Sequence, residues 1–395
     1  MKGVGIAAEF NPFHRGHKYI IEEAKKRTGC DFAGVVMSGS FCQRGEPAVF
    51  DKFLRTKAAL LNGADIVIEL PVIFASSAAD AFAWGSVETI EKAGIFSHMA
   101  FGVEAESLKD LEKAAEVLSL EPDEFKTSLR GFSNEGFSFP KARELALRQI
   151  FDFPEGIFNK PNNILALEYL KAIKVKNCPL TAAGIQRIGS GYNDPEFKGE
   201  FSSGAAVRRS IGEGLFEEVK AAVPISAYSL YKEHFGEKQP SLENYKEALK
   251  YLILRLKPEG LENICDITEG LENKIYKNAG FESVEGLVSA LKSKRYTESK
   301  LKRAIAHILL DIKKEDVFPL PQAPYIRVLG VKKEAKGLLS ELKEKAKAPV
   351  IINVKKDAEG LDGNAKKILE KEIFSTGLRD AKNKASDFTE GLIVV

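Results

Sequence analysis

The chain has 395 residues, of which 44% are hydrophobic and 29% charged, and its formal net charge at pH 7 is +2. This length is enough for two domains with their own cores, and the composition is typical of a globular protein. The small net charge excludes a uniformly basic nucleic-acid coat but is compatible with a local basic patch.

The cysteines and the apolar runs indicate the cellular setting. The four cysteines are far apart and show no Cys-x-x-Cys spacing, so the sequence supports neither a zinc knuckle nor a disulfide framework. No basic leader precedes a long apolar core, and no stretch approaches the roughly 18 uninterrupted apolar residues of a membrane span. We therefore expect reduced thiols, a cytoplasmic location and no membrane contact.

The first predicted strand leads into a turn that contains two histidines. Residues 4–8 form an apolar run that is typical of a buried strand, and Asn11-Pro12 breaks this run. A helix is then predicted to begin near Gly16, with an apolar face at residues 20–24. His17 would lie in the first turn of this helix.

His14 and His17 are the candidate catalytic residues of this turn. The unpaired N–H groups and the dipole of a first helical turn favour a phosphate group, and Gly16 lets the backbone approach it closely. Two imidazoles at i and i+3 can donate hydrogen bonds to phosphate oxygens as charge builds up on a leaving pyrophosphate. The alternative is two ordinary polar histidines in an exposed loop, but the strand before them and the helix after them favour the phosphate site.

Apolar strands and helical segments alternate along the first half of the chain. Strands are predicted at residues 33–37, 66–70, 99–101 and 180–185, and helices at residues 53–62, 76–93, 108–118 and 164–173. This alternation predicts a doubly wound α/β fold with a Rossmann-like parallel sheet. Because ligands of such sheets lie at the carboxyl ends of the strands, the histidine turn and Gly102 should line one crevice.

Beyond residue 212 the pattern changes to long amphipathic helices rich in Lys and Glu. Apolar strand-like runs return only at residues 325–329 and 350–354. We therefore predict a catalytic α/β domain over residues 1–212 and a mainly helical domain over residues 213–395.

Three blocks of sequence resemble a known family. They are Glu9-Phe10-Asn11-Pro12-Phe13-His14-Arg15-Gly16-His17, Met37-Ser38-Gly39-Ser40-Phe41-Cys42-Gln43-Arg44-Gly45-Glu46-Pro47-Ala48 and Gly63-Ala64-Asp65-Ile66-Val67-Ile68-Glu69-Leu70-Pro71. The turn over residues 14–17 resembles the signature of the HIGH-motif nucleotidyltransferases, and the longer blocks resemble the bacterial tRNA(Met) cytidine acetate ligases. Residues 161–165 and 294–297 also resemble that family, so the resemblance covers most of the chain.

The resemblance implies an ATP-dependent ligase. Acetate would attack the α-phosphate of ATP to give acetyl-adenylate and pyrophosphate, and the acetyl group would pass to N4 of the wobble cytidine of elongator tRNA(Met). ATP is then a co-substrate, Mg²⁺ is expected beside it, and coenzyme A is not needed. Two alternatives stay open: an adenylyltransferase or cytidylyltransferase that acts on a phosphorylated alcohol, and a non-catalytic RNA-binding protein that retains the turn.

The resemblance also implies which residues bind ATP. They are Ala7, Ala8, Glu9, Phe10, Asn11, Pro12, Phe13, His14, Arg15, Gly16, His17, Lys18, Tyr19 and Ile20 of the turn, together with Gly102, Asn162, Asn163, Arg187, Ser203 and Arg208. Residues 201–208 resemble the second signature of the superfamily, in which a serine-rich turn enters a helix and an arginine binds the triphosphate. Ala205 stands where many relatives carry a threonine, so we expect no hydroxyl contact from that position.

Several of these residues also have a structural interpretation. Asn162 and Asn163 open a helix, so that capping alone can explain one of them, and contact of the other with adenine or ribose is the alternative. Arg187 follows a predicted strand and precedes Gly189-Ser190-Gly191, where an arginine can meet phosphate or ribose.

Residues 292–303 are the candidate tRNA-binding segment, because they carry six basic residues against one acidic residue. The predicted contacts are Lys294, Arg295, Tyr296, Lys300 and Arg303. A merely solvated helix face is the alternative for the cations. Tyr296 can either stack on an exposed base or pack beneath the helix.

Three residues near the second predicted strand suggest other chemistry. Glu46 and Asp51 could hold Mg²⁺ among phosphates, although local capping and pairing is the simpler interpretation. Cys42 has no neighbouring base that would activate its thiol, so we expect it to be inert.

Overall fold

The computed structural model describes residues 1–105, 107–137, 139–188, 196–197, 199–293, 296–380 and 386–395. Its strands are β1 (Gly3–Ala8), β2 (Phe32–Ser38), β3 (Ile66–Leu70), β4 (Phe96–Val103), β5 (Thr181–Gln186), β6 (Ile326–Val331), β7 (Val350–Ile351) and β8 (Ile393–Val394). Its first helices are α1 (Arg15–Thr28), α2 (Lys52–Leu61), α3 (Val72–Ala75), α4 (Ala79–Ala93), α5 (Leu108–Leu120), α6 (Asp123–Asn134), α7 (Phe139–Ile150), α8 (Pro161–Val175) and α9 (Gly204–Glu213). They are followed by α10 (Phe216–Ala222), α11 (Ile225–Tyr231), α12 (Lys246–Leu261), α13 (Leu271–Lys277), α14 (Val284–Leu291), α15 (Glu298–Leu310), α16 (Lys314–Val317), α17 (Gly337–Lys345), α18 (Val354–Asp357) and α19 (Gly363–Arg379).

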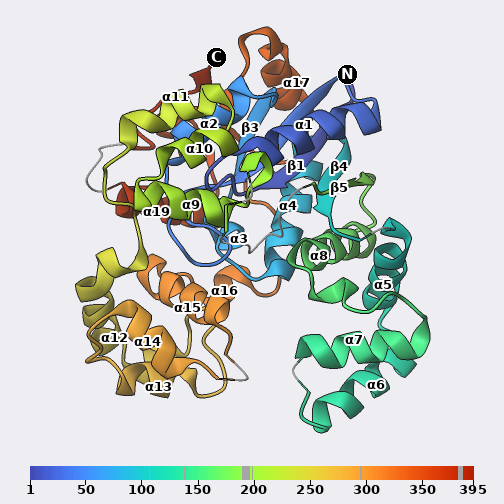
Figure 1. Ribbon diagram of the computed structural model, residues 1–395, viewed down its shortest axis with the longest axis vertical. Coiled ribbons are helices and arrows are strands. Elements are labelled where there is room, and N and C mark those ends of the chain that lie inside the picture. Colours follow the sequence, from blue (N-terminus) through green and yellow to red (C-terminus); the bar gives the residue numbers. More distant parts are fainter. Residues whose placement is uncertain (106, 138, 189–195, 198, 294–295, 381–385) are drawn as a thin grey trace.

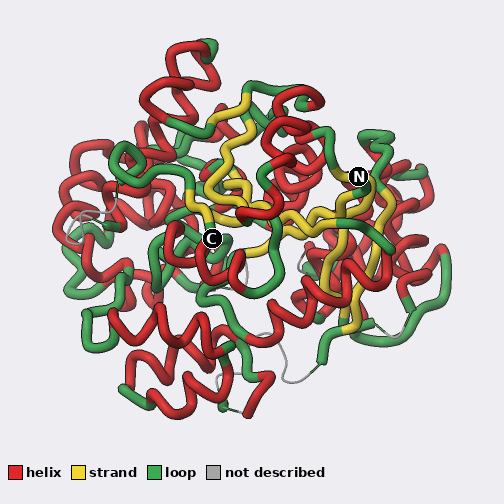
Figure 2. Tube along the Cα trace, turned by 90° about the horizontal axis from the view of Figure 1, so that it is seen from above, coloured by secondary structure: helices red, strands yellow, loops and turns green. Residues whose placement is uncertain are grey.

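The described strands form one sheet, with the order β5-β4-β1-β2-β3-β6-β7 and with β8 paired to β6. Strands β1 to β5 are all parallel to their neighbours among themselves. Figure 2 shows the strands in the middle of the molecule with helices around them. Strand β1 has β2 on one side and β4 on the other, so the strand order reverses beside it and its carboxyl end lies at a topological switch point. The predicted α/β fold with a Rossmann-like parallel sheet is confirmed.

The sheet is apolar on both faces because helices cover both. Alternate residues of β2 enter different cores: Val35 and Met37 pack in one, and Val36 packs in the other. Helices α1 and α2 contribute to the first core, whereas α4 and α8 contribute to the second. A strand buried on both faces has a nearly continuous apolar sequence, which explains why the runs at residues 33–37 and 66–70 were recognisable.

The C-terminal half of the chain completes the same sheet. Strand β6 pairs antiparallel with β3, with Ile66 opposite Val331 and Ile68 opposite Val328. The pairing covers the edge of β3, whose main-chain N–H and C=O groups would otherwise be open to other chains. The domain boundary predicted at residue 212 falls inside α9. The sheet contains strands from both sides of this boundary, because β6, β7 and β8 lie beyond it.

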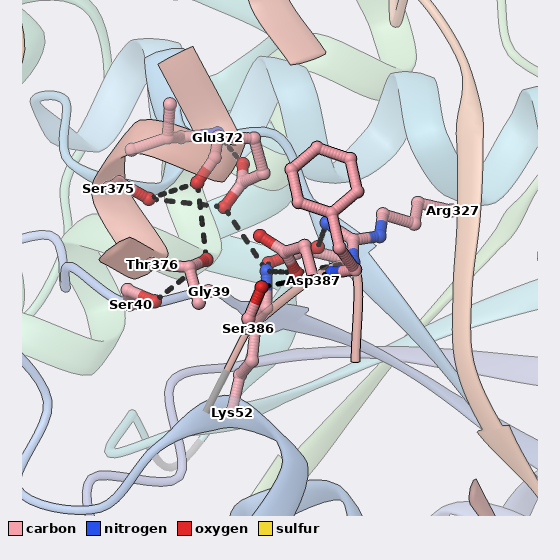
Figure 3. A network of polar contacts seen from close by, with 12 residues as sticks. Gly39, Ser40, Lys52, Arg327, Glu372, Ser375, Thr376, Ser386 and Asp387 are labelled. Atoms are coloured by element: carbon pink, nitrogen blue, oxygen red, sulfur yellow. Dashed lines mark hydrogen bonds and ion pairs between the residues drawn. The ribbon is translucent and has the colours of Figure 1, made fainter. Parts of the chain in front are cut away.

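A cluster of buried charges fixes the end of the chain to this edge (Figure 3). Lys52 Nζ lies 2.7 Å from both Glu69 Oε1 and Asp387 Oδ1, and Arg327 contacts the same two carboxylates at 2.8 and 2.5 Å. Burial and the neighbouring Glu69 carboxylate raise the pKa of Glu372 well above its ordinary value. The cluster joins α2, β3, β6, α19 and the C-terminal segment. Removal of any one of these buried charges would leave its partner uncompensated, which would destabilise the junction.

Two groups of helices extend from the body that holds the sheet. Figure 1 shows α12–α15 and α6–α7 as separate groups on the same side of that body. Helix α15 packs on α12 and α14, and α6 packs on α7. Among the described helices, none has the length and apolar character needed to cross a membrane.

Candidate nucleotide-binding site

The two histidines cap the helix that follows β1. His14 is the N-cap of α1, and its Nδ1 accepts a hydrogen bond from Gly16 N at 3.1 Å. His17 Nδ1 in turn accepts one from His14 N at 3.2 Å, which completes a capping box made of imidazoles. Because a neutral imidazole that accepts at Nδ1 carries its proton at Nε2, each ring keeps an Nε2–H group as its donor.

His14 is buried, His17 is partly buried, and both rings are neutral. Their centroids are 3.7 Å apart with a stacked geometry, and His14 is only 5% exposed. Burial, together with the positive charges of Arg187 and Arg208, lowers the pKa of His14 to about 3. Burial and the His14 ring likewise lower the pKa of His17 well below its ordinary value. The alternative interpretation, two ordinary polar histidines in an exposed loop, is wrong, because the two rings complete a capping box and the His17 ring packs against Phe10 and Phe13.

The histidines line a cavity at the carboxyl ends of the central strands. Its walls come from the turn, from the loop after β2, from the end of β4, and from α4, α8 and α9. The lining residues are Ile6, Ala7, Ala8, Glu9, Phe10, Asn11, His14, His17, Ile20, Cys42, Gln43, Arg44, Glu46, Phe82, Phe101, Gly102, Asn162, Leu165, Tyr169, Arg187, Gly204, Ala205 and Arg208. The histidine turn and Gly102 thus line one cavity, as the strand order requires.

Part of the predicted turn faces away from this cavity. Phe13 is fully buried in the core, Arg15 donates to the Ala221 carbonyl at 2.8 Å, and Lys18 pairs with Glu22 at 3.7 Å. The helical period explains the division, because it places His17 and Ile20 on the cavity side and the residues between them elsewhere. The predicted residues outside the walls of this cavity are Pro12, Phe13, Arg15, Gly16, Lys18, Tyr19, Asn163 and Ser203.

The two asparagines have different surroundings. Asn163 is fully buried, donates to the Ile157 carbonyl at 2.9 Å and accepts from Glu104 N at 2.8 Å. Asn162 lines the cavity, donates to the Glu104 carboxylate and accepts from Arg187 Nη1 at 3.4 Å. Asn162 therefore stands at the ligand side, and Asn163 fixes the start of α8.

Helix α9 brings the second predicted phosphate contact to the histidines. Ser203 is its N-cap and accepts from Ala206 N at 3.1 Å, so its hydroxyl has a structural partner. Arg208 lies one turn further and donates to the Asn11 carbonyl at 2.6 Å. The helix therefore places a guanidinium group beside the turn that holds His14.

The loop after β2 forms a wall that the residue-by-residue prediction missed. Cys42 N donates to the Glu46 carbonyl at 2.9 Å, and Gly45 takes a left-handed conformation with φ of 77°. A side chain on Gly45 would come within 2.5 Å of the α15 backbone, so this glycine lets the loop lie directly on the helical region. The signal was present in the block at residues 37–48, but a Gly-Glu-Pro sequence alone is typical of an ordinary turn.

The other two candidates near this loop have protein partners. Asp51 caps α2 by accepting from Leu54 N at 2.7 Å, which agrees with the interpretation as a local cap. Glu46 pairs at 2.7 Å with Lys302, which is distant in the sequence, so its pairing is not local. Burial raises the pKa of the Cys42 thiol far above its ordinary value, so that thiol is unreactive as expected.

An apolar wall of the cavity was also missed. Phe82, Phe101, Leu165 and Tyr169 lie opposite the turn, and the rings of Phe101 and Tyr169 are 5.4 Å apart. Their spacing in the sequence is that of ordinary core residues, so periodicity could not distinguish them.

The basic segment at α15 is engaged within the protein. Arg303 Nε lies 2.8 Å from Asp266, and Lys300 donates to Thr268 Oγ1 at 3.0 Å. Tyr296 is 3% exposed and its hydroxyl donates to the Thr268 and Glu269 carbonyls, so the ring packs beneath the helix and cannot stack on a base. The predictions for Lys294 and Arg295 lie outside the described residues.

One group within the described residues has the proximity of metal ligands: Cys265, Asp266 and His307. The ligand atoms of Asp266 and His307 already have protein partners. Asp266 pairs with Arg303, and the ring nitrogens of His307 lie 3.2 and 3.0 Å from the carbonyl oxygens of Cys265 and Ser76. This cluster joins α15 to the end of α3 and is not a metal centre in this arrangement.

Comparison with known proteins places these features in a family. The profile of the HIGH Nucleotidyl Transferase family matches residues 1–390. The tRNA(Met) cytidine acetate ligase of Thermoanaerobacter sp. (strain X514) is 41% identical over 99% of each chain, and that of Acetivibrio thermocellus is 36% identical over the full length of both. The crystal structure of apo Thermotoga maritima TmcAL superimposes over both full chains with a TM-score of 0.93 at 30% identity. The structure of that protein bound with alpha-thio ATP superimposes with a TM-score of 0.89. The chain therefore belongs to the tRNA(Met) cytidine acetate ligase family of HIGH nucleotidyl transferases.

Proposed function

We propose that the protein is an ATP-dependent ligase that joins acetate to N4 of the wobble cytidine of elongator tRNA(Met). The observation that carries the proposal is the pair of neutral imidazoles, of which His14 is buried and His17 partly buried, whose Nε2–H donors share one cavity with Arg187 and Arg208. The names of the relatives supply the identity of the acid and of the tRNA.

The first step is the formation of acetyl-adenylate in this cavity. Acetate is ionised at neutral pH, so its attack on the α-phosphate of ATP needs no general base. The Nε2–H groups of His14 and His17 and the two guanidinium groups stabilise the charge that develops on the pyrophosphate. They act as fixed donors, because burial keeps both imidazoles neutral and capping fixes their tautomer.

Mg²⁺ is part of the proposal as a companion of ATP. The carboxylates that line the cavity have protein partners, since Glu9 accepts from Gln43 N at 2.7 Å and Glu46 pairs with Lys302. We therefore infer that the phosphate oxygens and water hold this ion, as is usual for Mg²⁺ beside nucleotides.

The second step is the transfer of the acetyl group to RNA. The exocyclic amine of cytosine is a weak nucleophile and needs an activated acyl donor, which acetyl-adenylate provides. An anticodon loop presents unpaired bases, so its cytidine can enter an enzyme pocket without opening a duplex.

A direct assay tests the proposal. The protein is incubated with ATP, labelled acetate and bulk tRNA without coenzyme A, and the digested tRNA is analysed by mass spectrometry. We expect N4-acetylcytidine, and none when a non-hydrolysable α,β-linked ATP analogue replaces ATP.

Two outcomes would contradict the proposal. Product formed from acetyl-coenzyme A alone would exclude the adenylate route. Nucleotidyl transfer to a phosphorylated alcohol, without modified tRNA, would favour the small-molecule transferase.

A further inference from the structure

The cavity that His14 and His17 line is called the nucleotide cavity below. A second cavity adjoins it on the side of helices α12–α15. It lies between the loop after β2, α9, residues 239–243 and the facing parts of α14 and α15, and its volume is about 710 Å³. We call it the α9–α14 groove. Glu46 and Arg208 line both cavities, so the groove opens toward the place where the α-phosphate chemistry occurs.

The lining of the groove combines apolar and charged side chains. Val49, Leu242 and Val288 provide apolar surface. The charged lining residues are Arg208, Arg209, Lys292 and Lys302 together with Glu46, Glu243, Glu285 and Glu298. This volume lies within the range of about 300 to 1,000 Å³ that is usual for small-ligand sites. Apolar surface for the face of a base, beside charged side chains of both signs for its polar edge, suits an unpaired nucleotide of a nucleic acid.

On the basis of the proposed function, we propose that the α9–α14 groove receives the acceptor cytidine of the tRNA, and that Glu46 accepts a proton from its N4 amine.

The structure holds Glu46 firmly at the junction of the two cavities. Its carboxylate pairs with Lys302 Nζ at 2.7 Å, and its carbonyl accepts from Cys42 N at 2.9 Å. The close approach of Gly45 to α15 fixes the loop from the other side. A carboxylate held in this way by a rigid loop and a cation can meet an incoming amine without rearrangement.

The charge on Lys302 supports the assignment. Burial disfavours its ammonium form, but the carboxylates of Glu46 and Glu298 outweigh this effect and raise the pKa of Lys302 above its ordinary value. The resulting ammonium group lies 2.7 Å from the Glu46 carboxylate and holds it in place at the junction of the two cavities.

The chemistry balances with these groups alone. The N4 lone pair forms a bond to the carbonyl carbon of acetyl-adenylate, and the bond from that carbon to the phosphate oxygen breaks with its electron pair going to AMP. One N4 proton passes to the Glu46 carboxylate and then to solvent. The products are N4-acetylcytidine in the RNA, AMP and a proton.

The decisive experiment separates the two steps of the reaction. In Glu46→Gln the side-chain oxygen still accepts from Lys302, but the basic carboxylate is lost. We expect acetate-dependent exchange of pyrophosphate into ATP to stay within about twofold of wild type. Single-turnover transfer from preformed acetyl-adenylate to tRNA should fall about 100-fold, at the lower end of the usual contribution of a general base.

Glu341→Gln is the matched control. Glu341 also pairs with a lysine, Lys345, at 2.7 Å, but it lines neither cavity. We expect transfer within about threefold of wild type. Transfer by Glu46→Gln at the wild-type rate, or loss of pyrophosphate exchange in that variant, would overturn the role given to Glu46.

A second pair of variants tests the groove itself. Ser289 and Ala290 are neighbouring exposed residues of α14, and only Ser289 lines the groove. We expect Ser289→Trp to lower transfer at least tenfold with normal pyrophosphate exchange, and Ala290→Trp to resemble wild type. Equal transfer by the two tryptophan variants would overturn the assignment of the groove, whereas wild-type protein that makes no acetyl-adenylate would overturn the proposed function first.

Discussion

The nucleotide cavity and helix α15 both contain cationic or hydrogen-bond-donating side chains that are recognisable in the sequence. In the structure, the cations of these two regions have different partners. In the cavity, Arg208 donates to the Asn11 carbonyl and Arg187 to the Asn162 amide, which are neutral groups. On α15, Arg303 and Lys302 pair with carboxylates of the same protein. A cluster of cations in a sequence therefore does not by itself indicate a ligand, because on α15 the fold supplies opposing carboxylates.

The largest expected effect concerns the histidine donors. His14→Asn keeps a capping acceptor at the helix N-terminus, and His17→Gln keeps the acceptor of the capping box, but each variant loses its Nε2–H group. Pyrophosphate exchange should fall roughly 100-fold to 1,000-fold, as when one preorganised donor is removed, with little change in the melting temperature. Exchange near the wild-type rate in both variants would reduce the turn to a structural role.

A smaller effect should distinguish the two asparagines. Asn163→Ala leaves the buried Ile157 carbonyl and Glu104 N–H without their partner, which should lower the free energy of unfolding by about 1–3 kcal/mol. Asn162→Ala should instead raise the KM for ATP, with the unfolding midpoint close to wild type. Denaturant unfolding and steady-state kinetics on both variants measure the difference, and the reverse assignment would place Asn163 at the ligand.

The neutral histidines also predict a dependence of stability on pH. The pKa of His14 falls from 6.5 in the unfolded chain to about 3 in the fold, so below pH 6.5 the unfolded chain binds a proton that the native protein does not. The free energy of unfolding should therefore decrease as the pH falls from 6.5 toward 3, by at most about 1.4 kcal/mol per pH unit for this residue. Comparison of wild type with His14→Asn at pH 7 and pH 5 isolates the contribution, and equal slopes would show that His14 titrates normally.

The smallest expected effect concerns the basic segment. Arg303→Ala removes the partner of Asp266, so it should lower the melting temperature and leave the salt dependence of tRNA binding unchanged. The double variant Lys294→Ala/Arg295→Ala should instead reduce the slope of log Kd against log salt by about 0.7 to 0.9 for each phosphate group that the variant no longer neutralises. An altered slope in Arg303→Ala would restore this residue to the RNA surface.

The sequence predicted the elements whose residue types have a single structural or chemical interpretation. The parallel strands were recognisable because burial on both faces demands continuous apolar runs, and the histidine turn was recognisable because its residue types are rare. The sequence could not predict that residues 326–331 add a strand to the sheet of the first half, because their antiparallel pairing with β3 joins segments that are distant in the chain. The apolar wall at Phe82 and Tyr169 was missed for a related reason, because a side chain that faces a ligand and one that faces the core have the same hydrophobic character.

The pairing of β3 with β6 has a consequence for how the protein is made. As the chain leaves the ribosome, β1 to β5 are available long before residues 326–331, and Asp387 emerges later still. Throughout this interval the nascent β3 edge is unpaired. Lys52 then lacks its partner Asp387, and Glu69 lacks its partner Arg327. We therefore expect the nucleotide-binding half to mature only after residues 326–331 and Asp387 have left the ribosome, and to be the part most in need of chaperone protection during translation.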